Sequence, residues 1–152
     1  MTERDISWWV PQVGATEYGL VREVLDSNYL NDGDVTSRFE CEIARLVGAR
    51  YAVGVTSGTA ALFLALAALG VGAGDEVVVP DLTFIATANA VTLTGATPVL
   101  VDIDPLTLNM SPEAFRNAIT ARTRAVVPVH VSGRSADLSA IGAIARDHNV
   151  AI

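Results

Sequence analysis

The sequence predicts an α/β fold, arranged as three α/β/α layers around a mostly parallel sheet. Short apolar runs alternate with longer helical patterns through most of the chain. The runs VVVP and AVVPV are apolar at consecutive positions, which is typical of strands covered by helices on both faces. With 152 residues, of which 51% are hydrophobic and 18% charged, the chain can bury a substantial core.

Two helices are expected before the first strand, at residues 18–27 and 35–47. In the second, apolar residues recur at helical spacing from Val35 to Val47, and Gly48 is placed to end it. The other elements follow in order: a strand at 52–55, a helix at 59–69, a strand at 76–79, a helix at 84–93, a strand at 98–101, a helix opened by Ser111, a strand at 125–129, a helix at 135–148, and a strand beginning at 150.

Composition excludes several classes of function. The net charge of −7 disfavours binding to nucleic acid or to anionic membranes, because both need a basic patch. The single cysteine, Cys41, cannot form an internal disulfide, so a reducing, cytoplasmic location is expected. Neither a signal peptide nor a membrane helix is expected, and no spacing of histidines and carboxylates suggests a metal site.

The junction between the strand at 52–55 and the following helix is a candidate anion site. It reads Thr56-Ser57-Gly58-Thr59, and the first amides of a helix have no intrahelical acceptor. Gly58 can adopt backbone angles that are closed to other residues, and the hydroxyls of Ser57 and Thr59 could add donors for a phosphate. The alternative is a plain cap by Thr56 or Ser57 with no ligand. Neither a Walker loop nor a dinucleotide fingerprint is present.

Further candidates follow other strands, where ligands bind in sheets of this kind. Phe84 is either a ring that stacks on a ligand or a core phenylalanine. His130 is explained equally well as a structural, hydrogen-bonded histidine and as a residue that contacts a ligand. Asp102 and Asp104 form a pair of carboxylates, but Asp-Pro also forms turns, and the turn is preferred.

Three stretches of the chain are informative together: TSGTAALFLALAALGVGAGDEVVVPDLTFIATANAV, GATPVLVDIDPLTLNM and RTRAVVPVHVSG. Their succession resembles the DegT/DnrJ-type sugar aminotransferases, which are fold type I enzymes that use pyridoxal 5'-phosphate. The likeness extends upstream through YLNDGDVTSRFE and covers nearly all of the chain from about residue 13. Two departures follow His130, where Val131-Ser132 and Arg134-Ser135 replace residues frequent in the family.

The resemblance implies a role for each candidate residue. Gly58 and Thr59, with Ser57, would hold the cofactor phosphate, Phe84 would lie against the pyridine ring, and His130 would contact the cofactor. The implied reaction moves an amino group from an amino acid such as glutamate to a keto sugar linked to a nucleotide, in a homodimer. Residues 1–34 would form an N-terminal arm and helix, and residues 35–152 part of the large cofactor-binding domain.

The sequence contains no lysine, because all ten basic residues are arginine. Aminotransfer requires a lysine as covalent anchor and proton shuttle, so no catalytic residue is assigned in this chain. We therefore expect the front part of a longer polypeptide that is inactive alone. A sugar dehydratase of the same fold, and a non-catalytic remnant or binding module, are the alternatives.

Overall fold

The computed structural model describes residues 10–152, which divide into two compact units. The first unit ends at Gly54, and the second runs from Val55 to Ile152. The expectation of no signal peptide concerns mainly residues 1–9 and lies outside the described residues. No helix within residues 10–152 is both long enough and apolar enough to span a bilayer.

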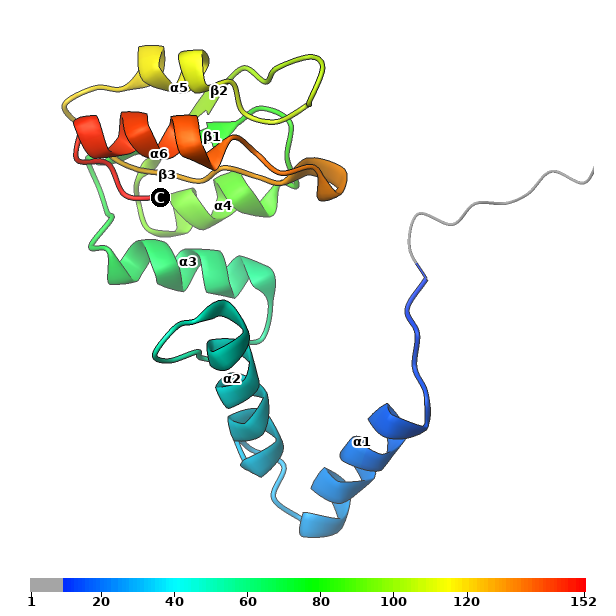
Figure 1. Cartoon of the computed structure of the whole chain (residues 1–152). Helices are drawn as coiled ribbons and strands as arrows, with labels where there is room; N and C mark the ends of the chain where they lie inside the picture. Colours follow the sequence, from blue (N-terminus) through cyan, green and yellow to red (C-terminus); the bar gives the residue numbers. More distant parts are fainter. Residues whose placement is uncertain (1–9) are drawn as a thin grey trace, which may run out of the picture. The chain divides into compact units, whose positions relative to one another are not determined.

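The described part of the first unit contains two helices, α1 (Ala15–Ser27) and α2 (Asp34–Val47) (Figure 1). Both confirm the prediction, although α1 begins three residues early. It does so because the Gly14 N–H donates to Glu17 Oε2 at 2.7 Å, which caps the helix start. An ion pair of 2.8 Å between Arg38 and Glu23 joins α2 to α1.

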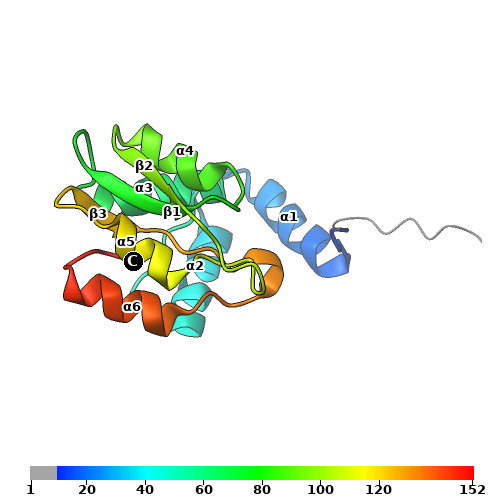
Figure 2. The ribbon, with the colours of Figure 1, turned by 90° about the horizontal axis from the view of Figure 1, so that it is seen from above.

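The second unit is an α/β layer structure. Its elements are α3 (Gly58–Ala68), β1 (Glu76–Pro80), α4 (Ala86–Leu93), β2 (Thr97–Val101), α5 (Pro112–Ala118), β3 (Thr123–Val126), the 3₁₀ turn η1 (Val131–Gly133) and α6 (Leu138–Asp147). The three strands are parallel in the order β2-β1-β3, and Val77 stands in register with Pro98 of β2. Figures 1 and 2 show α3 and α4 on one side of this sheet and α5 and α6 on the other. The predicted three-layer class is therefore confirmed.

Strand β1 lies between two apolar clusters, one on each face of the sheet, and all five of its residues are buried. Side chains alternate across a strand, so its valines divide between the two faces. Val78 joins the cluster under α5 and α6, whereas Val77 and Val79 join the cluster under α3 and α4. A continuous apolar run is therefore what this position in the sheet requires.

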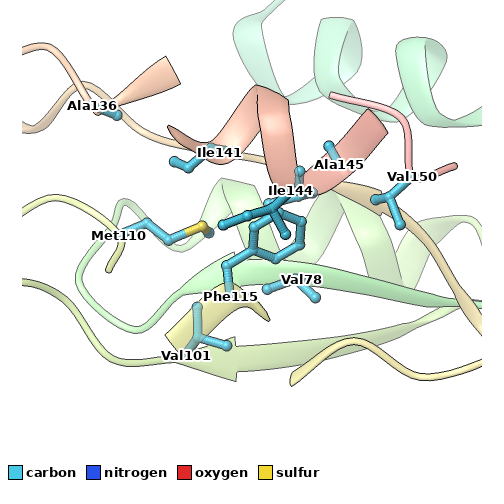
Figure 3. Packing of buried hydrophobic residues seen from close by; sticks show 10 residues of the cluster. Val78, Val101, Met110, Phe115, Ala136, Ile141, Ile144, Ala145 and Val150 are labelled. Carbon is cyan, nitrogen blue, oxygen red and sulfur yellow. The ribbon is translucent and has the colours of Figure 1, made fainter. Parts of the chain in front are cut away.

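Phe115 is the largest side chain of the first cluster. It is fully buried, and it points from α5 toward Ile141 and Ile144 of α6 above Val78 (Figure 3). Met110 fills the space beside the ring. These contacts hold α5 and α6 on the sheet.

A buried carboxylate fastens the amino ends of the strands. Glu76, the first residue of β1, is only 6% exposed and accepts hydrogen bonds from Thr120 Oγ1 and Arg122 Nη2. Both partners lie just before β3, so the network joins the start of β1 to the start of β3. A buried charge needs such partners to be tolerated.

One predicted strand is wrong in the described chain, and another is represented by a single bridge. Residues 52–55 form no strand, and Tyr51 and Val53 are each 78% exposed. At residue 150 only a single parallel bridge forms, between Ala125 and Ala151. A strand exists only through hydrogen bonds to a neighbour, and no strand among residues 10–152 pairs with 52–55.

Replacing Phe115 by alanine should lower the free energy of unfolding by about 3–5 kcal/mol, because the substitution leaves a cavity between α5, α6 and β1. Urea unfolding of the 152-residue chain followed by circular dichroism measures this. Phe39→Ala is the matched control, since Phe39 is 58% exposed, and it should cost less than about 1 kcal/mol. Equal losses in the two variants would contradict the assigned core.

Candidate functional site

An open hollow of about 680 Å³ lies where α3 begins and where the chain leaves β1 and β3. Its lining comes from the start of α3, from the segment between β1 and α4, and from the residue before His130: Gly58, Thr59, Ala61, Leu62, Ala65, Thr83, Phe84, Ala86, Thr87 and Val129. Ligands of open α/β sheets bind at this end of the strands. Three of the five predicted cofactor residues therefore lie in or beside one concavity: Gly58, Thr59 and Phe84.

The start of α3 presents two free amide donors. Ser57 is extended, and its Oγ accepts from the Ala60 N–H at 3.2 Å. The Ser57 carbonyl accepts from the Ala61 N–H at 3.0 Å. The N–H groups of Gly58 and Thr59 have no protein acceptor among residues 10–152. The helix dipole favours an anion beside them.

The cap and the anion site are compatible at this helix start. Ser57 caps α3 through the lone pairs of its oxygen, as one reading of the sequence predicted. Its hydroxyl proton remains available for a ligand, because accepting a hydrogen bond does not use it.

Gly58 has ordinary backbone angles and open space beside its Cα. Its φ is outside the left-handed region, so Gly58 does not use the unusual backbone angles that are open to glycine. It is the first residue of an ordinary helix. A Cβ at this position would meet no atom of the chain within 4 Å. Packing within the chain therefore does not require glycine here, and the open backbone can accept a close ligand.

Phe84 is 77% exposed and lines the hollow, which contradicts the core-phenylalanine alternative. Helix α4 begins two residues later than predicted, at Ala86. The hydroxyls of Thr83 and Thr87 lie 2.8 Å apart and hold the bend before the helix. A large ring exposed in a concavity indicates a surface that binds a flat, apolar group.

His130 is exposed at the end of the segment after β3, and it is not part of the lining of the hollow. Its neighbour Val129 is. The imidazole is tied to the backbone, because Nδ1 accepts from the Ala136 N–H at 2.9 Å. The structural reading of His130 is thus correct in part, and its contact with a ligand remains a prediction.

Asn109 is a residue that the sequence analysis missed. It is 3% exposed, and its side chain donates to the carbonyls of Arg134 and Ser135 at 3.2 and 3.1 Å. Its Oδ1 accepts from the Val131 N–H at 3.1 Å. An asparagine between two apolar residues was the only signal in the sequence, and it does not reveal partners more than 20 positions away.

Asp104 forms a turn, as predicted. Its Oδ1 accepts from the N–H groups of Leu106 and Thr107 at 2.8 and 2.9 Å. The Thr107 bond, followed by the Leu106 bond, lowers the pKa of this carboxyl below its ordinary value of 3.8. Within residues 10–152, no group of three histidine, cysteine or acidic side chains is arranged to hold a metal ion.

The fold and the hollow define an α/β domain with an open concavity at the carboxyl ends of its strands. Residues 11–152 match the DegT/DnrJ/EryC1/StrS aminotransferase family, and the chain belongs to this family. It is 51% identical over 141 residues to the spore coat polysaccharide biosynthesis protein SpsC of Bacillus subtilis.

Solved structures of relatives share this architecture. A 3-amino-5-hydroxybenzoic acid synthase is 42% identical, with a TM-score of 0.88 over 92% of this chain and 37% of its own. An aminotransferase from Psychrobacter cryohalolentis is 40% identical, with a TM-score of 0.88 over 96% of this chain and 37% of its own. A candidate sugar aminotransferase from Streptococcus pneumoniae, in its PLP form, is 31% identical with a TM-score of 0.90, over 98% of this chain and 38% of its own.

The chain spans little more than a third of the length of these relatives, and 36% of SpsC. The matched regions cover nearly all of this chain, including the residues that line the hollow. What the relatives do as whole enzymes is therefore carried to this chain only as a proposal.

Replacing Asp104 by asparagine should destabilise the chain at neutral pH and matter less in acid. A carboxyl whose pKa is lowered by folding stabilises the fold above its unfolded pKa, and this contribution is lost as the pH falls through the folded pKa. The difference in urea midpoint between the two chains should be constant above about pH 5 and shrink below about pH 4. A difference that is the same at about pH 7 and about pH 3 would contradict the role assigned to Asp104.

Proposed function

We propose that this chain is the part of a pyridoxal 5'-phosphate-dependent aminotransferase that binds the cofactor phosphate and ring. The amino group would pass from an amino acid such as glutamate to a keto sugar linked to a nucleotide. The relatives named above support this assignment: they include aminotransferases, one of them in a PLP form, and a protein of polysaccharide biosynthesis.

The observation that carries the proposal is the combination found in one hollow. Two free amides at Gly58 and Thr59 suit a phosphate dianion, and the open face of Gly58 gives it room. The exposed ring of Phe84 lines the same hollow and suits a flat pyridine. The residues present therefore fit both ends of the cofactor.

Each residue has a defined task in this proposal. Gly58 and Thr59 bind the phosphate through backbone N–H groups, and the hydroxyl of Ser57 adds a donor. Phe84 orients the ring, and His130 contacts the cofactor from the segment after β3. When bound, pyridoxal 5'-phosphate supplies an electron sink for the substrate carbon. Without a lysine, this chain binds and orients and is assigned no proton transfer.

The partners, location, assembly and domain division follow from the same proposal. The partners would be the amino donor and the nucleotide-linked sugar, with no nucleic acid and no membrane. A cytoplasmic homodimer is proposed for the protein, as is the division into an arm at 1–34 and the cofactor-binding part at 35–152. The net charge of −7 agrees with the absence of a nucleic-acid partner.

Gly58→Ala should weaken binding of pyridoxal 5'-phosphate without harming the fold. The new methyl group meets no atom of the chain, but it occupies the space the phosphate needs. Losing charge-assisted hydrogen bonds should reduce affinity roughly tenfold or more. The measurement is a titration followed through the ¹⁵N amide signals of Gly58 and Thr59, with pyridoxal, which lacks the phosphate, as the control ligand.

Gly19→Ala is the matched control variant for this experiment. Gly19 also lies in a helix with open space around its Cα, but far from the hollow in the sequence and in the other unit. It should leave the affinity unchanged. Equal binding of pyridoxal and its phosphate by the wild-type chain would overturn the proposed phosphate site.

Phe84→Ala should lower the affinity for pyridoxal 5'-phosphate by about fivefold, which corresponds to a stacking contribution of about 1 kcal/mol. Inorganic phosphate has no ring, so its affinity should not change. Leu82→Ala serves as control, because Leu82 is an exposed apolar residue two positions away that does not line the hollow. Equal effects of the Phe84 substitution on both ligands would argue against stacking.

A further inference from the structure

The segment after β3 contains a turn that needs external support. Ser132 has φ 50° and ψ 36°, and Gly133 follows with φ 78°. Left-handed angles are unfavourable for a serine, so this backbone persists only where its surroundings fix it. The supports come from a loop more than 20 residues earlier in the chain.

Asn109 supplies the main support. Its amide side chain reaches both ends of η1, accepting from the Val131 N–H and donating to the carbonyls of Arg134 and Ser135. With these three hydrogen bonds its oxygen and its amide nitrogen are both satisfied within the buried site. A buried amide in such a network is costly to alter.

The backbone of Asn109 is itself held in place. Its carbonyl accepts from the Asp104 N–H at 2.8 Å, and its neighbour Met110 is buried in the core. The Arg134 guanidinium adds a second tie between the loops, donating to the Leu106 carbonyl at 3.2 Å. Asn109 thus links the turn to the part of the chain that is anchored in the core.

The backbone that follows this turn determines the tautomer of the His130 ring. Because Nδ1 accepts from the Ala136 N–H, the neutral ring carries its proton on Nε2. The residue immediately before it, Val129, lines the hollow. His130 therefore offers an Nε2–H donor at the ligand-binding end of the sheet, with its tautomer set by the backbone.

We propose that Asn109 is a positioning residue that holds His130 as an Nε2–H donor to an oxygen atom of the bound cofactor. The proposal rests on the proposed function, since it names the cofactor as the acceptor. Asn109 itself acts only through the backbone at 131–136.

The first test is the tautomer of His130 in the wild-type chain, read from the ¹⁵N shifts of its two ring nitrogens at a pH where imidazole is neutral. We expect the Nε2–H signature for His130. His148, whose ring makes no hydrogen bond to residues 10–152, is the internal control and should show a mixture. A mixed signal from His130 would overturn the proposal, whatever the variants do.

The second test is Asn109→Asp, which keeps the shape and the acceptor but loses the two donated hydrogen bonds. We expect the His130 tautomer to become mixed and hydrogen exchange at the Ala136 amide to rise roughly tenfold. Asn117→Asp, the same change at an exposed position on α5, should alter neither. An unchanged His130 signature in a folded Asn109→Asp chain would refute the positioning role. If that variant does not fold, the wild-type tautomer and ligand titrations decide.

Two ligands separate this inference from the proposed function. Pyridoxal 5'-phosphate should shift the Gly58 and Thr59 amides and also the His130 Nε2 signal, whereas inorganic phosphate should shift only the amides. Shifts at the amides alone with both ligands would leave the phosphate site standing and refute the contact to His130. No shift at the amides with either ligand would remove the proposed function itself.

Discussion

The double burial of β1 is the constraint on which the second unit depends. Its valines alternate between two apolar layers, and each layer holds a pair of helices against the sheet. A strand covered on both faces cannot slip by one residue without exchanging all its side chains between the layers. The burial of both faces therefore specifies the register of β1 strongly.

The two ends of this sheet have different tasks. At the amino end, Glu76 is buried and fully engaged with Thr120 and Arg122, which stabilises the alignment of β1 and β3. At the carboxyl end, amides, an aromatic ring and an open glycine face have no partners among residues 10–152. Groups at an exposed helix start can bind water or a ligand without disturbing the packed core.

Much of this organisation can be read from the sequence, because the local signals agree with the tertiary structure. The run from Glu76 to Pro80 and the cap at Ser57 are encoded within a few residues. The strand expected at 52–55 fails for a non-local reason, since pairing needs a neighbour that no nearby residue reveals. The open space beside Gly58 is likewise a non-local property, because it depends on which parts of the folded chain lie nearby. The hydrogen bonds of the Asn109 side chain span more than 20 residues, and no periodic pattern in the sequence indicates them.

Pro98 has a consequence for how this sheet can widen. Proline has no N–H, so it is tolerated in β2 where the missing donor faces away from the ladder with β1. The outer flank of β2 is thus a poor template for another strand. On the opposite flank, Ala151 already bridges Ala125 in parallel orientation. Growth of the sheet, whether in assembly, in fusion designs or in misassembly, is directed beyond β3.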